Sequence, residues 1–176
     1  MKVHFEDESR IGLIINRRRR ITLKGVKPIG HIQYQHQSFW LYGSVAPYTG
    51  DSFFLELPMT DTQGFQYFLN ALSRRYPNCL NILFLDQARF HRGEELIAPD
   101  NVLLVPLPPY SPELNPMERV WEYIKDLIAW ERFRDLSHLS DRICTIIQAF
   151  TKDTLKSLTY YPYIRQYFEP TTIEAL

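Results

Sequence analysis

The sequence has few of the residues that would place it in several common classes of protein. Cys79 and Cys144 are its only cysteines, too few for a disulfide framework, and they show none of the Cys/His spacing of a zinc site. No apolar run approaches the ~20 residues needed to cross a bilayer. The charged segment Met1–Asp7 also lacks the apolar stretch of a signal peptide. We therefore expect a cytoplasmic protein with no membrane partner.

Net charge is absent as well. The 176 residues include 20 basic and 20 acidic side chains, which cancel. Proteins that hold nucleic acid by charge alone are usually basic, so this balance argues against strong autonomous DNA binding. A content of 45% hydrophobic and 14% aromatic residues is instead typical of a globular fold with a sizeable core.

The order of the apolar segments predicts an α/β fold, a mixed sheet flanked by helices. Short apolar runs bounded by turn residues predict strands, and longer stretches with helical spacing predict helices. We expect one domain over residues 1–150, with residues 151–176 forming a C-terminal helix and tail that pack on it or extend from it. The expected elements are strands at 2–7, 80–86 and 101–105, a hairpin within 30–57 that turns at 48–51, an extended proline-rich loop at 106–112, and helices at about 60–76, 115–128 and 136–150.

Three acidic residues stand where an active site could form. Asp7 closes the first apolar run, Asp86 ends the run that begins at Leu80, and Glu118 follows the proline-rich segment near the start of a predicted helix. Active sites of open α/β sheets lie beyond the carboxyl ends of strands, so we expect these carboxylates to converge. Such hard oxygen ligands suit Mg²⁺ or Mn²⁺, and a pair of these ions can drive phosphoryl transfer.

Each of these residues also has a simpler interpretation. Asp86 could be a turn or capping aspartate. Any one of Glu6, Asp7 and Glu8 could be the residue that faces inward. With Asn115 as the N-cap, Glu118 is the third helical residue and would complete a capping box. The long proline-rich approach to that helix is more than a cap requires.

Two further features have both a functional and a structural interpretation. His91 lies five residues after Asp86, where it could orient a carboxylate or contact a phosphate, although a lone histidine is more often structural. The run Arg17–Arg20 is of a kind that usually forms a solvated loop. Beside an acidic metal site, however, it could hold a DNA backbone.

Three motifs resemble the catalytic domain of mariner-related bacterial insertion-sequence transposases. They are Asp7-Glu8, Leu85-Asp-Gln-Ala-Arg-Phe-His91 and Leu107-Pro-Pro-Tyr-Ser-Pro-Glu-Leu-Asn-Pro-Met-Glu-Arg-Val-Trp121. The last motif is highly specific, the second moderately so, and the first is weak alone. The resemblance covers Val3 to about Phe150. It implies a DDE transposase of the DDE superendonuclease type, with a ribonuclease H-like, retroviral-integrase-like fold.

The resemblance also implies a chemistry and a set of residues. Asp7, Asp86 and Glu118 would bind Mg²⁺ or Mn²⁺, two ions per site in the active complex. Water and then a DNA 3′-hydroxyl would attack phosphodiesters in line. Residues adjacent to these ligands would be Glu8, His91 and Asn115. The DNA-binding residues would be Arg17, Arg18, Arg19, Arg20, Lys24, Lys27, Arg89, Arg119 and Lys125.

The sequence departs from the family pattern in several ways. Gln87 stands where the family usually has asparagine, the basic connector lacks its usual tryptophan, and the spacing of 118 − 86 = 32 positions from Asp86 to Glu118 is a little tight. The chain also starts almost at Asp7, so the family's helix-turn-helix module lies outside it.

The partners expected from this reading are insertion-sequence ends and target DNA, a separate or frameshift-fused helix-turn-helix module, and a second copy in an active homodimer. One alternative is a catalytically idle or truncated fragment that regulates full-length transposase. Another is an unrelated ribonuclease H-like nuclease, which would leave the proline-rich motif unexplained.

Overall fold

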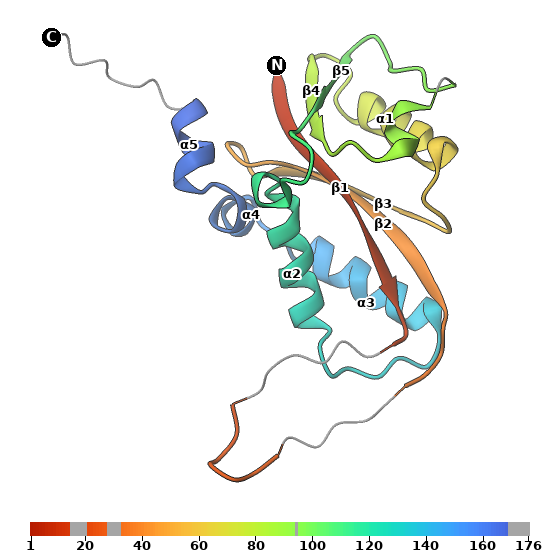
Figure 1. The fold of residues 1–176 in the computed structure, drawn as a ribbon, viewed down its shortest axis with the longest axis vertical. Coiled ribbons are helices and arrows are strands. Elements are labelled where there is room, and N and C mark those ends of the chain that lie inside the picture. The colour runs from red at the N-terminus through yellow and green to blue at the C-terminus, as the bar shows by residue number, and fades with distance from the viewer. Residues whose placement is uncertain (15–20, 28–32, 94, 169–176) are drawn as a thin grey trace, which may run out of the picture.

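The fold is built on a five-stranded mixed sheet with the strand order β3-β2-β1-β4-β5 (Figure 1). The central strand β1 pairs antiparallel with β2 and parallel with β4, so the predicted mixed sheet is confirmed. The strands are β1 (Lys2–Gly12), β2 (Ser38–Ala46), β3 (Asp51–Leu57), β4 (Asn81–Leu85) and β5 (Val102–Pro106). The computed structural model describes residues 1–14, 21–27, 33–93 and 95–168.

In the described residues, five α-helices and two short 3₁₀ turns accompany the sheet. Asp61 and Asp135 start two of the helices, because their side chains accept hydrogen bonds from the backbone N–H groups of Gly64 and His138 at 2.7 and 2.9 Å. The elements are α1 (Thr62–Arg75), η1 (Arg89–Arg92), η2 (Pro112–Leu114), α2 (Met117–Leu127), α3 (Leu136–Gln148), α4 (Lys152–Thr159) and α5 (Pro162–Phe168).

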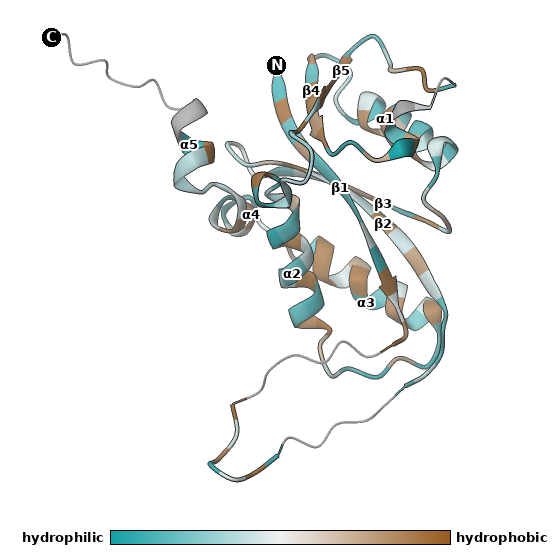
Figure 2. Ribbon diagram, viewed as in Figure 1, coloured by the Kyte–Doolittle hydropathy of each residue, from teal (hydrophilic) through white to brown (hydrophobic). Residues whose placement is uncertain are grey.

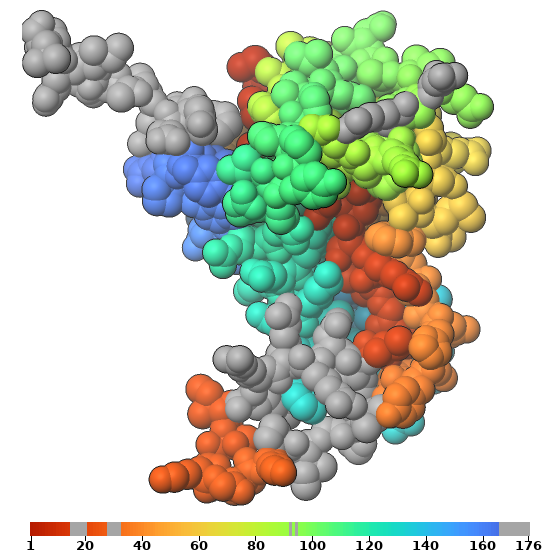
Figure 3. Space-filling view, in the orientation of Figure 1, coloured from red at the N-terminus to blue at the C-terminus, as the bar shows by residue number. Residues whose placement is uncertain are grey.

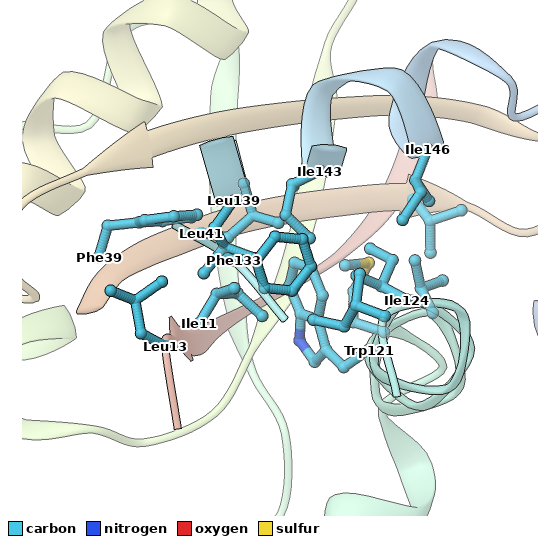
Figure 4. Close-up of a cluster of buried hydrophobic side chains, with 14 of the residues drawn as sticks. Ile11, Leu13, Phe39, Leu41, Trp121, Ile124, Phe133, Leu139, Ile143 and Ile146 are labelled. Carbon is cyan, nitrogen blue, oxygen red and sulfur yellow. The ribbon is translucent and has the colours of Figure 1, made fainter. Parts of the chain in front are cut away.

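Each face of the sheet carries its own hydrophobic core, because side chains alternate along the strands. In β2, Phe39 and Leu41 belong to the core that α2 and α3 cover, whereas Tyr42 belongs to the core under α1. Figure 4 shows the first of these cores, with Trp121 and Leu139 among the helical residues packed against the sheet. Hydrophobic and hydrophilic residues alternate along α2 and α3 (Figure 2), as expected of helices with one buried face.

The observed elements differ from the predicted ones in three places. β1 extends to Gly12, five residues beyond the expected end at Asp7, because β2 continues to pair with it. The first hairpin strand begins only at Ser38, and residues 33–37 are not in a strand. The C-terminal segment contains two short helices, α4 and α5, where one was expected.

A partly buried ion cluster joins the first residues of β1 and β3 to the start of α4. Asp51 contacts the Nζ atoms of Lys2 and Lys152, the latter at 2.8 Å. Burial alone would raise the pKa of Asp51, but the hydrogen bonds from Lys152 and Lys2 outweigh it and hold that pKa well below its usual range. Separately, none of the helices in the described part of the chain has both the length and the apolar character needed to cross a membrane.

Candidate active site

Asp7 lies where the sheet splits. The parallel ladder between β1 and β4 ends at the pair Phe5 and Phe84, whereas β1 continues beside β2 to Gly12. Asp7 is two residues beyond that last pair. The expectation that Asp7 ends its strand was therefore wrong, because β1 keeps its antiparallel partner. The divergence of β1 from β4 nevertheless opens space at this point of the sheet.

Asp7, Asp86 and Glu118 line one cavity of about 500 Å³. Asp86 directly follows β4, and Glu118 lies in the first turn of α2. In Figure 3 the proline-rich loop (green) and α2 (teal) lie on the face where β1 (red) is exposed. The structure thus brings together the three carboxylates that the sequence singled out, and their role as metal ligands stays a prediction. Other parts of the wall come from Gln87, Ala88, residues 107–112 and Asn115.

Glu118 does not complete a capping box. Such a box would use the backbone N–H of Asn115, but this group donates to the carbonyl oxygen of Pro112 at 2.9 Å. Because α2 begins at Met117, Glu118 is its second residue rather than its third. The buried Asn115 side chain accepts a hydrogen bond from the N–H of Met117 at 3.1 Å and donates one to the carbonyl oxygen of Glu6 at 2.7 Å. Asn115 therefore fastens the start of α2 to β1.

Trp121 provides a contact that the sequence did not predict, since it had been assigned only to the apolar face of its helix. Its Nε1–H donates to Asp7 Oδ2 at 2.8 Å. Gly43, which pairs with Asp7 across the sheet, makes room for the indole, because a Cβ at Gly43 would lie only 2.6 Å from Trp121 Cη2. The sequence offered one indication of this contact, because the indole N–H of a buried tryptophan usually has a hydrogen-bond partner.

Negative charge accumulates in the cavity. Burial, and then the charges of Glu8 and Glu118, raises the pKa of Asp7 to about 7, while the hydrogen bond from Trp121 acts in the opposite direction. Among the described residues that line the cavity, none is a lysine or an arginine. Carboxylate oxygens with no lysine or arginine among them in the cavity wall are a donor set that fits Mg²⁺ or Mn²⁺.

The three carboxylates do not form a tight cluster. Within the described ranges, the group of acidic and histidine side chains whose ligand atoms lie within 4.8 Å of one another consists of Glu6, Glu8 and His91. Like charges repel, so ionised carboxylates around one cavity favour a wider spacing than a tight cluster.

His91 links Asp86 to the opposite face of the sheet. Its Nδ1 lies 2.9 Å from Asp86 Oδ1, and its Nε2 lies 3.1 Å from Glu8 Oε1. The ring centroid is 4.3 Å from that of Phe65 in the core under α1. Burial lowers the pKa of His91, but the hydrogen bonds to Asp86 and Glu8 outweigh this effect and raise the pKa to about 9. Glu8 thus reaches Asp86 through His91.

The predicted DNA-binding residues are only partly placed. Arg17, Arg18, Arg19 and Arg20 lie outside the described residues. Arg119 is next to Glu118, and its guanidinium lies 5.8 Å from the ring centroid of Tyr161. The exposed members of the set are Lys24, Lys27, Arg89 and Arg119, and Lys125 is half-buried.

A family model described as a DDE superfamily endonuclease matches residues 2–140. The chain belongs to the DDE superfamily endonuclease family. The matched stretch contains all three cavity carboxylates, Asp7, Asp86 and Glu118, so the resemblance inferred from the motifs is confirmed at the level of the family.

The chain is also similar to one protein in sequence and to several solved structures in fold. An uncharacterized protein of Sinorhizobium fredii, y4pE/y4sA, is 37% identical over 107 residues, which are 60% of this chain and 79% of that protein. Crystal structures of the Mos1 mariner paired-end complex with Mn and with Mg are 16% identical, with TM-scores of 0.71. They cover 90% of this chain, which spans about half the length of the Mos1 chains (52% and 51%). The likeness confirms the predicted ribonuclease H-like fold.

Proposed function

We propose that this DDE domain is the catalytic domain of an insertion-sequence transposase, which cuts and joins DNA with the help of divalent metal ions. The observation that carries the proposal is that Asp7, Asp86 and Glu118 come from three separate segments and line one cavity of a chain that belongs to an endonuclease family. The Mos1 structures are of mariner paired-end complexes with Mn and with Mg, which supports the same chemistry here.

Asp7, Asp86 and Glu118 are the proposed ligands of Mg²⁺ or Mn²⁺, two ions per site. Ions bound there would supply Lewis-acid chemistry and neutralise charge at a phosphodiester. The rest of the chain positions the ligands. The hydrogen bond from Trp121 favours the ionised form of Asp7, and the contact with His91 orients Asp86.

Water and then a DNA 3′-hydroxyl are the proposed nucleophiles, so no side chain forms a covalent bond to DNA. In this assignment the protein contributes positioning and charge stabilisation, which dominate catalysis of phosphoryl transfer. The exposed Arg119 follows Glu118 directly, and the exposed Arg89 lies three positions after Asp86; both are proposed to contact the DNA backbone. Lys24, Lys27, Lys125 and the run Arg17–Arg20 complete the proposed DNA-binding set.

Recognition of the element's ends is assigned to other parts of the assembly. A net charge of zero supports weak autonomous DNA binding, so we assign end recognition to a separate or frameshift-fused helix-turn-helix module. The active complex is proposed to be a homodimer that brings two ends together. Residues 1–150 form the proposed catalytic domain, and α4 and α5 in the segment 151–176 are a C-terminal addition to it, with Leu155 of α4 in the core under α2 and α3.

Nicking of supercoiled plasmid tests the proposal. The purified chain is incubated with Mg²⁺ or Mn²⁺ beside an Asp86→Asn variant and a matched Asp141→Asn control, whose substituted side chain is exposed on α3. Nicking that needs the metal, is lost with Asp86→Asn and is kept by the control is the expected result. Equal nicking by Asp86→Asn would contradict the proposal.

A chain that does not nick at all is then mixed with full-length transposase. If both the wild-type chain and Asp86→Asn change the activity of that transposase, the chain is a regulatory partner. The family match and the intact carboxylate set favour the enzyme over this alternative.

A further inference from the structure

Glu6, Glu8 and His91 form a compact cluster on the face of the sheet that α1 covers. One ligand atom from each residue lies within 4.8 Å of the others. Glu6 and Glu8 alternate with Asp7 along β1, so they point away from the cavity that Asp7 lines. His91 comes from η1, which follows β4. The cluster is therefore a second group of potential metal ligands, behind the candidate active site.

Glu6 is the member that the protein alone leaves unsatisfied. It is 0% exposed, and within the described part of the chain no N–H or hydroxyl group donates a hydrogen bond to either of its carboxyl oxygens. A carboxylate buried in this way is costly unless a positive charge or hydrogen-bond donors compensate it. Glu6 Oε2 lies 3.7 Å from His91 Nε2, so it faces the cluster at a distance too long for a hydrogen bond.

His91 has the arrangement typical of a metal-bound histidine. Such residues usually donate one ring N–H to a carboxylate and bind the metal through the other nitrogen. Here Nδ1 lies 2.9 Å from Asp86 Oδ1, and Nε2 faces the two glutamates. A tetrahedral ion with bonds of about 2.0–2.1 Å holds its ligand atoms about 3.4 Å apart. The distances of 3.1 Å from Nε2 to Glu8 Oε1 and 3.7 Å to Glu6 Oε2 bracket that value.

The cluster is buried beside aromatic rings. The ring centroids of Phe65 and Phe90 each lie 4.3 Å from that of His91. The side chains of Glu8 and His91 are 6% and 2% exposed. When both glutamates are ionised, one divalent ion bound with a neutral imidazole would balance their two negative charges.

We propose that Glu6, Glu8 and His91 bind a divalent transition-metal ion of the Zn²⁺ type at a structural site behind the candidate active site. An imidazole nitrogen in the set suits Zn²⁺ better than Mg²⁺, which prefers oxygen ligands. The ion would hold the His91 ring with its Nδ1–H toward Asp86. Binding of the ion follows from the cluster alone, and only its effect on Asp86 as a catalytic ligand rests on the proposed function.

Zn²⁺ binding to the metal-stripped full chain tests the proposal. Stoichiometry is measured by equilibrium dialysis and elemental analysis, and coordination by the visible absorption of Co²⁺, with millimolar Mg²⁺ present throughout. All proteins carry Cys79→Ser and Cys144→Ser, which remove the thiol ligands. The test variants are Glu6→Gln and His91→Gln, and the matched control is the double variant Asp7→Asn, Glu118→Gln, which changes two of the cavity carboxylates.

We expect one equivalent of Zn²⁺ in the parent protein and in the control, absorption bands of four-coordinate Co²⁺, and at least tenfold weaker binding in both test variants. Binding that is lost in the control but kept by Glu6→Gln would place the ion in the cavity and overturn the proposal. The absence of a bound equivalent in the folded parent protein would also overturn it. This last result needs no variant, so it decides the question even if Glu6→Gln fails to fold.

Discussion

Replacing Asp7 by asparagine should change how the stability of the metal-free protein depends on pH. Asparagine has nearly the shape of a protonated aspartic acid but does not ionise. In the wild-type protein, burial and the neighbouring charges of Glu8 and Glu118 raise the pKa of Asp7 from 3.8 to about 7. The unfolded chain therefore releases this proton at a lower pH than the folded one, and the carboxyl destabilises the fold once both states are ionised.

The sign and size of the effect follow from the two pKa values of Asp7. Below pH 3.8 the carboxyl is protonated in both states, and its full contribution to stability is present. Between 3.8 and about 7 only the unfolded state ionises, so stability falls as the pH rises, and above about 7 the loss is complete. At 1.36 kcal/mol per pH unit the total loss is at most about 4 kcal/mol.

Urea unfolding at intervals between pH 4 and pH 8.5, with a chelator present, measures this loss. The pKa of Glu6 and that of His91 are also raised, and both groups lower stability as the pH rises. The quantity to compare is therefore the difference in the free energy of unfolding between Asp7→Asn and the wild type, which should increase by about 2–4 kcal/mol from pH 4 to pH 8. Asp141→Asn, at an exposed position on α3, is the matched control and should give no such trend.

Added Mg²⁺ tests whether Asp7 also binds a metal ion. At pH 8 a concentration 100-fold above the dissociation constant should stabilise the wild type by about 2.7 kcal/mol. Asp7→Asn should respond much less, since it lacks one proposed ligand. Parallel stability curves for Asp7→Asn and the wild type in the chelator series would refute the electrostatic reasoning, whatever Mg²⁺ does.

Two other substitutions test the packing around the site. Gly43→Ala should lower the free energy of unfolding in urea by about 1–3 kcal/mol and shift the Trp121 fluorescence, because the new Cβ would lie 2.6 Å from the indole and 2.7 Å from Met117 Cε. An unchanged spectrum and an unchanged stability would contradict this packing. Asp51→Asn should lower the free energy of unfolding by about 1–3 kcal/mol at pH 7, because it removes the charge that contacts Lys2 and Lys152. The pKa of Asp51 is lowered in the folded protein, so its contribution to stability is present above pH 3.8 and is lost as the pH falls through the folded-state pKa. The cost of the substitution should therefore shrink near pH 3. A cost for Asp51→Asn that does not vary with pH would contradict the role of its two lysines.

Local patterns predicted most of the elements because each carried its own signal. The run ending at Asp86 forms β4 because it is short, apolar and closed by a turn residue. Asp135 starts α3 through the same side-chain hydrogen bond that a capping aspartate makes in isolated helices. The specific proline-rich motif placed Glu118 at a helix start, and the structure brings it to the cavity with Asp7 and Asp86.

Features that depend on distant partners did not follow from such patterns. The length of β1 beyond Asp7 is set by pairing with β2, and a charged stretch such as Glu6–Arg10 gives no apolar alternation to indicate it. The hydrogen bond between Trp121 and Asp7 spans 114 positions and depends on the absence of a side chain at Gly43. Sequence reasoning identified the residues at the site but not the contacts that hold them.

The alternation along β1 explains why three consecutive acidic residues have different environments. Asp7 faces the cavity and Trp121, whereas Glu6 and Glu8 face the core under α1. His91 connects these two sides, because it contacts Asp86 through Nδ1 and Glu8 through Nε2. A substitution on the α1 side can therefore alter the orientation of Asp86 without touching the cavity. Glu8→Gln should on this reasoning reduce metal-dependent nicking even though Glu8 does not line the cavity, and full activity of that variant would show that Asp86 holds its orientation without the link.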